Sequence, residues 1–224
     1  MSPVLHVLSD RQRHTLPLEV ALVAAARGGA DVLQIREKKA PAKEIFELVQ
    51  KIQWRVRELS LPTKIFVNDR VDVALATEAD GVHLAAKSLP VKVAVAIRDR
   101  SGWQGKIGCS VHTLEEALQA ELEGADYVTF GHIYASESHP GQPPRGLFAL
   151  QKIVQSVSIP VIAIGGIEST NLEPVLTTGC NGVAVIGAVL HHVDPEGAAR
   201  RLIRKLRPDN STQGGENNRV DVKL

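Results

Sequence analysis

A chain of 224 residues, of which 44% are hydrophobic, is long enough to bury a sizeable core and has the usual length of one α/β barrel. Only 4% of the residues are aromatic, so the core is expected to consist of Val, Ile, Leu and Ala, as in parallel strands covered by Ala-rich helices. The formal net charge is +1 and acidic and basic residues are mixed along the chain, which argues against a nucleic-acid partner.

Short apolar runs alternate with longer amphipathic segments, a pattern that predicts strands alternating with helices. In chain order the expected strand–helix units are Leu5–Leu8 with Pro17–Arg27, Asp31–Ile35 with Pro41–Leu59, Lys64–Val67 with Val71–Thr77, Gly81–Leu84 with Val91–Arg98, Ile107–Ser110 with a helix capped by Thr113, Tyr127–Phe130 with Leu147–Val157, Val161–Ile164 with Asn171–Thr178, and Val183–Ile186 with Pro195–Leu206. Glu116, three residues after Thr113, completes a capping-box pattern. The units together predict a single (β/α)8 TIM barrel with parallel strands.

A short signature recurs where a helix ends and the next strand begins. Its copies are Gly29-Ala30-Asp31, Ala79-Asp80-Gly81, Gly124-Ala125-Asp126 and Gly179-Cys180-Asn181-Gly182. The glycines suit a helix C-cap and the Asp or Asn suits a tight turn, so the repeat favours βα units. The alternative is a doubly wound open sheet, which usually has a glycine-rich fingerprint after its first strand. Here the first strand is followed by Ser9-Asp10-Arg11-Gln12, which has no glycine.

The expected barrel domain spans residues 1–207, and the polar segment 208–224 is expected to be a disordered tail. Cys109 and Cys180 lie far apart without metal-ligand spacing, which predicts buried thiols in a reducing compartment. No basic segment leads into an apolar run at the start, and apolar stretches such as Val20–Ala26 are shorter than the roughly 20 residues of a membrane span. A cytoplasmic protein without a membrane partner is expected, and a homo-oligomer is an open alternative to a monomer.

The active site of such a barrel lies at the C-terminal ends of its strands. Two glycine turns, Gly165-Gly166 and Gly187, follow the last two predicted strands, where bare backbone N–H groups can bind a phosphate. The turns therefore predict a small phosphorylated ligand, although two tight turns without a ligand are the alternative. The same rule selects further polar side chains: Gln34, Arg36, Asn68, Asp69, His83, Ser110, His112 and His132.

The sequence leaves the roles of Arg36 and His83 open. Gln34 and Arg36 share one side of a strand, and Arg36 can grip a carboxylate or phosphate or form an ion pair with Glu37 or Glu58. His83 is either a substrate contact or a hydrogen-bonded interior histidine.

Over residues 4–205 the chain resembles the thiamine phosphate synthase superfamily. The matching strings are Gln34-Ile35-Arg36-Glu37-Lys38, Asn68-Asp69-Arg70-Val71-Asp72, Gly81-Val82-His83-Leu84, Ser110-Val111-His112-Thr113-Leu114-Glu115-Glu116 and Ala163-Ile164-Gly165-Gly166-Ile167. Each string alone is weak, but together they are highly specific. The resemblance implies the barrel fold and an enzyme of thiamine biosynthesis.

The superfamily has two main branches, and this chain departs from the synthase branch at two loops. Synthases read G-Q-[DE]-D after the fourth strand, where an acid helps to hold Mg²⁺, whereas this chain has Lys87 there, which cannot ligate a metal. After the sixth strand the synthase proline is replaced by His132 and the pyrophosphate-binding lysine by His139. Phe130-Gly131-His132 resembles the TenI-type thiazole tautomerases, in which the histidine after this glycine transfers the proton.

The expected function is therefore a thiazole tautomerase, a metal-independent isomerase without a cofactor. His132 is expected to be the catalytic residue, because an imidazole accepts and returns a proton near neutral pH. The expected substrate contacts are Gln34, Arg36, Asn68, Ser110, Gly165, Gly166 and Gly187, with Arg36 on the substrate carboxylate and the glycines on the phosphate of the thiazole. Two alternatives are a divergent Mg-dependent thiamine phosphate synthase and a non-catalytic regulatory protein that binds thiazole phosphate.

Overall fold

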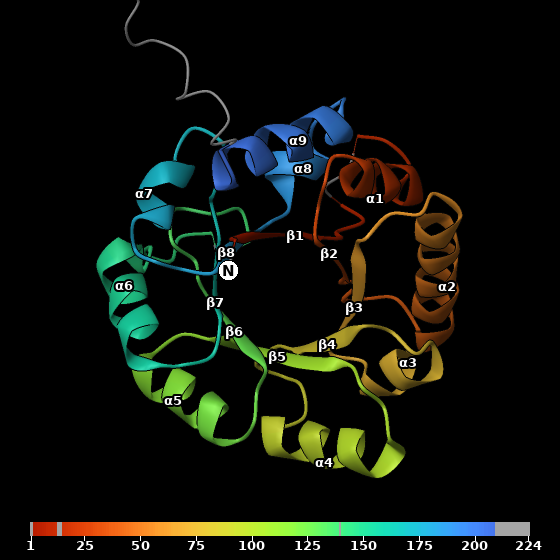
Figure 1. The fold of residues 1–224 in the computed structure, drawn as a ribbon, viewed down its shortest axis with the longest axis horizontal. Coiled ribbons are helices and arrows are strands. Elements are labelled where there is room, and N and C mark those ends of the chain that lie inside the picture. Colours follow the sequence, from red (N-terminus) through yellow and green to blue (C-terminus); the bar gives the residue numbers. More distant parts are fainter. Residues whose placement is uncertain (1, 13–14, 139, 209–224) are drawn as a thin grey trace, which may run out of the picture.

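The computed structural model describes residues 2–12, 15–138 and 140–208, which form a closed barrel of eight parallel strands. The strands are β1 (Val4–Leu8), β2 (Val32–Ile35), β3 (Lys64–Asn68), β4 (Gly81–Leu84), β5 (Lys106–Val111), β6 (Tyr127–Gly131), β7 (Val161–Ile164) and β8 (Gly182–Val185). Each strand pairs with the next along the chain, and β8 closes the ring against β1 (Figure 1). The predicted (β/α)8 barrel is confirmed.

Helices surround the ring of strands on the outside (Figure 1). They are α1 (Leu18–Arg27), α2 (Ala42–Glu58), α3 (Val71–Ala76), α4 (Val91–Ser101), α5 (Leu114–Leu122), α6 (Gly146–Ser156), α7 (Leu172–Leu176), α8 (Gly187–Leu190) and α9 (Pro195–Leu206). The sequence predicted all of them except α8, because four residues are too short to show a helical period. Ile186 is the N-cap of α8, which is why β8 ends one residue earlier than predicted.

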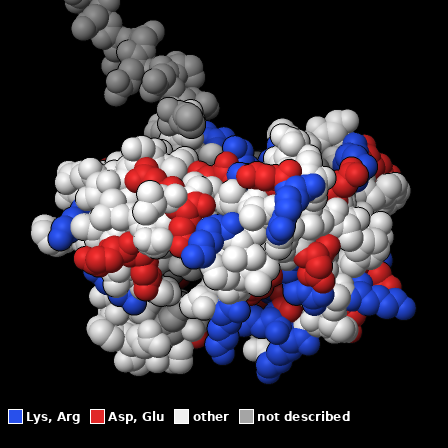
Figure 2. Space-filling view, turned by 90° about the horizontal axis from the view of Figure 1, so that it is seen from below, with Lys and Arg blue, Asp and Glu red and all other residues white. Residues whose placement is uncertain are grey.

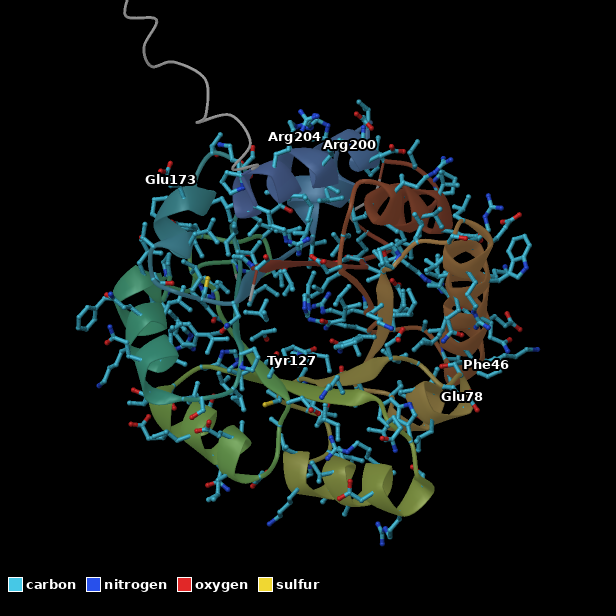
Figure 3. The ribbon with its side chains drawn as sticks, in the orientation of Figure 1. Phe46, Glu78, Tyr127, Glu173, Arg200 and Arg204 are labelled. Carbon is cyan, nitrogen blue, oxygen red and sulfur yellow. The ribbon has the colours of Figure 1, made fainter. Side chains whose placement is uncertain are left out.

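The interior of the barrel is packed with side chains of one strand parity, while the other parity faces the helices. The buried apolar side chains of this interior cluster are Leu8, Val32, Phe66, Tyr127, Ile162 and Ala184. Two glycines make room for its two rings: a Cβ at Gly81 would lie 2.9 Å from the Phe66 ring, and one at Gly108 would lie 2.0 Å from the Tyr127 ring. Figure 3 shows Tyr127 inside the ring of strands and Phe46 outside it.

The recurring Gly-Ala-Asp signature joins each even-numbered strand to the strand before it. The side-chain contacts are Leu5 N to Asp31 Oδ2 at 2.8 Å, Ile65 N to Asp80 Oδ2 at 2.9 Å, Ile107 N to Asp126 Oδ2 at 2.8 Å and Val161 N to Asn181 Oδ1 at 2.9 Å. In each pair the acidic or amide residue also donates its own backbone N–H to the carbonyl of the same partner. The repeat therefore stabilises the N-terminal end of the barrel, away from the predicted site.

Both cysteines are free and buried, as predicted. Burial raises the pKa of the Cys109 thiol to about 12 and also raises the pKa of Cys180.

The predicted tail lies, from residue 209 onward, outside the described residues. Within the described part of the chain, no helix has the length and apolarity needed to cross a membrane. The face drawn in Figure 2 carries Lys and Arg interspersed with Asp and Glu.

Candidate active site

A pocket of about 830 Å³ opens at the C-terminal ends of the strands. Residues from every strand of the barrel, or from the loop that follows it, contribute to its lining. All the predicted site residues line this pocket: Gln34, Arg36, Asn68, Ser110, His132, Gly165, Gly166 and Gly187. The barrel therefore brings the predicted residues together, although the role of each one stays a prediction.

A buried hydrogen-bonded cluster forms the floor of the pocket. His83 Nδ1 lies 3.0 Å from the Tyr127 hydroxyl oxygen, and its Nε2 lies 2.9 Å from Ser110 Oγ. Thr129 Oγ1 donates to Ser110 Oγ at 3.3 Å. A neutral imidazole has one donor and one acceptor nitrogen, so one hydroxyl donates to His83 and the other accepts from it. His83 is therefore an interior histidine with both nitrogens bonded, and it orients Ser110 toward the pocket.

Three buried residues beneath or beside this floor were not predicted as part of the site: Tyr127, Thr129 and His6. Tyr127 and Thr129 precede Gly131 on β6 at intervals of two residues, so they share its side of the strand. This alternation along β6 is the sequence signal that could have placed Tyr127 and Thr129 in the site. His6 packs edge-on against Phe66 and Tyr127, with ring centroids 6.0 and 5.6 Å apart.

Burial keeps the two interior histidines neutral. Desolvation lowers the pKa of His6 to about 4, an effect only partly offset by the charge of Asp31. Desolvation lowers the pKa of His83 to about 3, with a further lowering from His6 and Arg36 and an opposing contribution from Asp69. Neither imidazole is charged near neutral pH, so neither supplies positive charge to the pocket.

These two histidines predict a loss of stability in mild acid. Below pH 6.5 the unfolded chain takes up protons at His6 and His83 that the folded chain does not bind until about pH 4 and about pH 3. The free energy of unfolding should therefore fall as the pH drops, by about 1–2 kcal/mol per histidine between pH 6.5 and 5. Urea denaturation at both pH values should show that His6→Leu removes about half of this loss.

The control for that measurement is His192→Leu, because His192 is exposed. Its pH dependence should match that of the unsubstituted protein. A His6→Leu protein whose stability falls as steeply as the control's would contradict a neutral, buried His6.

Three polar side chains form a chain along the pocket wall between β2 and β3. Gln34 Nε2 donates to Asn68 Oδ1 at 2.7 Å, and Asn68 Nδ2 donates to Asp69 Oδ2 at 2.5 Å. Gln34 Oε1 is buried and has no hydrogen-bond partner among the residues that the structure describes. An unpaired buried acceptor costs free energy, so this oxygen is suited to accept a hydrogen bond from a ligand.

Asp69 also holds the turn that follows β4. Its Oδ1 accepts from Ala85 N at 2.9 Å and from the Ser88 hydroxyl. Its own N–H donates to the His83 carbonyl at 2.8 Å. The backbone of Asp69 is left-handed, with φ +62, a conformation that Asp tolerates better than most residues. Asp69 therefore joins the ends of β3 and β4 and fixes the turn at residues 85–88.

The glycine turns lie on the opposite side of the pocket. Gly165 and Gly166 have φ +100 and +66, and Gly187 is the first residue of α8. A Cβ at Gly165 would lie 2.3 Å from the Cβ of His132. His132 is buried, lines the pocket, and its Nε2 lies 3.3 Å from the Gln142 carbonyl oxygen. The turn at Gly165 therefore brings bare backbone close to His132 at the pocket wall.

Basic side chains gather at the side of the pocket formed by β2 and β4. Arg36, Lys38 and Lys87 all line it. Arg36 Nη1 lies 3.6 Å from Asp10 Oδ2, an ion pair that differs from the predicted pairs with Glu37 and Glu58. Lys87 is exposed in the turn held by Asp69. This side of the pocket suits an anionic group of a substrate.

Comparison with known proteins identifies the family. Residues 5–189 match the family described as thiamine monophosphate synthase. The chain belongs to this family. A protein from Chlorobium phaeovibrioides that is named thiamine-phosphate synthase is 44% identical to this chain over 205 residues. The match covers 91% of this chain and 94% of that protein. A second thiamine-phosphate synthase, from Pyrococcus furiosus, is 43% identical over 203 residues. That match covers 90% of this chain and 93% of the other protein.

The chain was also compared with solved structures, and one that is similar in both fold and sequence supports the same family. The thiamine phosphate pyrophosphorylase from Pyrococcus furiosus has a TM-score of 0.80 and 42% identity, and the match covers 91% of this chain and 94% of that one. A 3-hexulose-6-phosphate synthase has a TM-score of 0.66 at 17% identity, a likeness that shows the fold alone.

The predicted thiazole tautomerase is wrong, and with it the assignment to the TenI-type isomerases. Relatives 40–44% identical over most of the chain are named thiamine-phosphate synthases. The tautomerase prediction depended on Lys87, His132 and His139, which lie in loops after β4 and β6. Loop side chains can change within a family while the scaffold is kept, so these three positions were weaker signals than the whole-chain likeness. His139 lies outside the described residues.

The synthase branch is expected to use Mg²⁺, but the residues of this pocket do not fit that ion. Mg²⁺ requires near-octahedral oxygen ligands, usually including one or two carboxylates. Within the described residues, no group of three or more His, Cys, Asp and Glu side chains could hold a metal. Asp69 is occupied by Asn68, Ala85 and Ser88, and the adjacent turn carries Lys87. A cation beside the occupied carboxylate of Asp69 makes this turn a poor divalent-metal site.

Proposed function

We propose that this protein is a thiamine-phosphate synthase, a transferase that joins an aminopyrimidine bearing a methylene diphosphate to a thiazole phosphate. The observation that carries this proposal is the 44% identity, over 91% of the chain, to a protein of that name. The pocket volume of about 830 Å³ lies within the range of roughly 300–1,000 Å³ typical of small-molecule sites.

We assign the thiazole phosphate to the glycine turns. Gly165, Gly166 and Gly187 follow β7 and β8, where barrels often bind phosphate, and they carry no side chain that would keep an anion from the backbone N–H groups. His132 packs against Gly165 and forms part of the wall beside this subsite.

We assign the aminopyrimidine to the polar wall between β2 and β5. The unpaired Gln34 Oε1 suits the exocyclic amino group of the pyrimidine, which is a donor. Asn68 and Ser110, both positioned by hydrogen bonds to other side chains, supply further polar contacts. Arg36 lies at the rim above Gln34, where it suits the diphosphate.

The coupling itself requires orientation more than acid–base chemistry. The lone pair of the thiazole nitrogen forms a bond to the methylene carbon, and the carbon–oxygen bond to the diphosphate breaks with its electron pair. That nitrogen carries no proton, so the step needs no general base, and His132 has no proton to transfer in it. Holding the two rings in contact converts a bimolecular reaction into an effectively unimolecular one.

The test is to incubate the purified protein with both substrates and to measure thiamine phosphate and released pyrophosphate. Gln34→Leu is expected to raise the KM for the pyrimidine substrate roughly 10- to 100-fold and to leave the KM for the thiazole phosphate nearly unchanged, because only the pyrimidine loses its acceptor.

The matched control is Gln53→Leu, a buried glutamine on α2 that bonds to the Thr77 carbonyl outside the pocket. It should change neither KM. Binding of thiazole phosphate without formation of product would contradict the synthase proposal and favour a non-catalytic binding protein.

A further inference from the structure

Lys87 stands out among the cations of the pocket because it has no ion-pair partner among the described residues. It lies in the turn after β4, at the pocket rim, and its side chain is exposed. Because no ion pair with a described residue holds this lysine, its ammonium can reach an anionic ligand in the pocket.

Hydrogen bonds hold the turn that carries Lys87. Asp69 accepts hydrogen bonds from Ala85 N and from the Ser88 hydroxyl, and Ser88 N donates to the Ala85 carbonyl at 2.9 Å. Asp69 is in turn held by Asn68 and by the backbone of β4. The carboxylate at the end of β3 therefore fixes the backbone on both sides of Lys87.

We propose that Lys87 takes the place of a divalent cation, neutralising the diphosphate of the pyrimidine substrate while Asp69 serves as the anchor of the turn. The proposal rests on the synthase function proposed above and concerns how the same site handles its leaving group. It explains together the occupied carboxylate of Asp69, the hydroxyl of Ser88 beside it, and a rim ammonium that has no ion-pair partner in the described part of the chain.

In the coupling step, the electron pair of the breaking carbon–oxygen bond moves onto the diphosphate. The added negative charge lies on the leaving oxygen, and a fixed positive charge nearby stabilises it. The ammonium of Lys87 supplies that charge through charge-assisted hydrogen bonds and keeps its protons. The positive charge that forms on the thiazole ring stays with the product, so the step balances without any other reactant.

Calorimetry with inorganic pyrophosphate tests this proposal without catalysis. In EDTA, the full chain is expected to bind pyrophosphate, and Lys87→Met should weaken that binding roughly 10- to 100-fold. Lys87→Arg should retain most of the affinity, because the charge is kept. Lys92→Met, an exposed lysine of α4 outside the pocket lining, is the control and should bind like the unsubstituted protein.

Binding of pyrophosphate by the unsubstituted protein only when Mg²⁺ is added would overturn the proposal. Equal binding by Lys87→Met and the unsubstituted protein would also overturn it, as would an Arg variant as weak as the Met variant.

Turnover separates this proposal from the function on which it rests. In EDTA the rate of thiamine phosphate formation should remain at least about half of the rate with Mg²⁺, because the cation is part of the chain. Product formed only with Mg²⁺ would overturn the role of Lys87 and leave the synthase function standing. Absence of product under both conditions would refute the synthase function, and the pyrophosphate calorimetry would still decide whether Lys87 binds the anion.

Discussion

Gly166→Ala is expected to raise the KM for the thiazole phosphate about 100-fold or more, equivalent to about 2.7 kcal/mol of lost binding. Gly166 has φ +66, and an added Cβ would lie 2.4 Å from the Ala135 carbonyl oxygen and 2.8 Å from the Cβ of Tyr134. Both contacts are shorter than packed atoms allow, so the turn must shift and its N–H groups would leave the phosphate position.

The matched control is Gly102→Ala. Gly102 has φ +71, nearly the same backbone conformation, but nothing lies within 4 Å of its Cβ position. It caps α4 at the C-terminal end of that helix and is not part of the pocket. Its substitution should cost only about 1–2 kcal/mol of stability for the left-handed backbone and leave the KM unchanged. Steady-state kinetics in which both variants show the same KM would remove the glycine turn from the phosphate site.

Asp69→Ala is expected to lower the free energy of unfolding by about 3 kcal/mol and to reduce kcat/KM for coupling at least tenfold. The substitution leaves Asn68 Nδ2 and the Ser88 hydroxyl without the carboxylate that accepts from them, whereas Ala85 N keeps Ser88 Oγ as an acceptor. Each part-buried donor left unpaired costs about 1–3 kcal/mol. It also places alanine at φ +62, which Asp adopts more readily. With the turn released, Lys87 would no longer be held at the rim.

Asp72→Ala provides the comparison for this variant. Asp72 is three residues further along the chain, with 65% of its side chain exposed, and it pairs with Arg70 at the surface. An exposed ion pair contributes little, so urea denaturation should show a loss of less than about 1 kcal/mol. Equal losses for the two variants would show that Asp69 contributes no more to stability than an exposed ion pair does.

The predictions for Gly166→Ala and Asp69→Ala depend on features that the sequence revealed only in part. The glycines after β7 and β8 were visible as a pattern, because turns that need positive φ or close approach to backbone select glycine whatever surrounds them. Asp69 was visible as a rim residue. Its hydrogen bonds to Ala85 and Ser88, 16 and 19 residues further along the chain, were not. Contacts between neighbouring strand ends depend on register, which no local pattern of residues specifies.

The choice between branches of the family shows the same limit. Lys87, His132 and His139 were given the greatest weight because they depart from a known pattern, and they led to the wrong reaction. Identity of 40–44% across the chain is spread over helices, strands and rim alike, so it reports on the scaffold and its family more reliably than a few loop positions do.

The sequence by itself determined the alternation of strands and helices, the closed parallel barrel and the rim residues, because hydrophobic periodicity, helix caps and glycine turns are local and repeat along this chain. Only the tertiary structure decided which polar groups meet. It pairs His83 with Tyr127 and Ser110, leaves Gln34 Oε1 without a partner and occupies the carboxylate of Asp69. The physical reason is that hydrogen bonds act over about 3 Å, so which donors and acceptors satisfy one another is set by closure of the barrel.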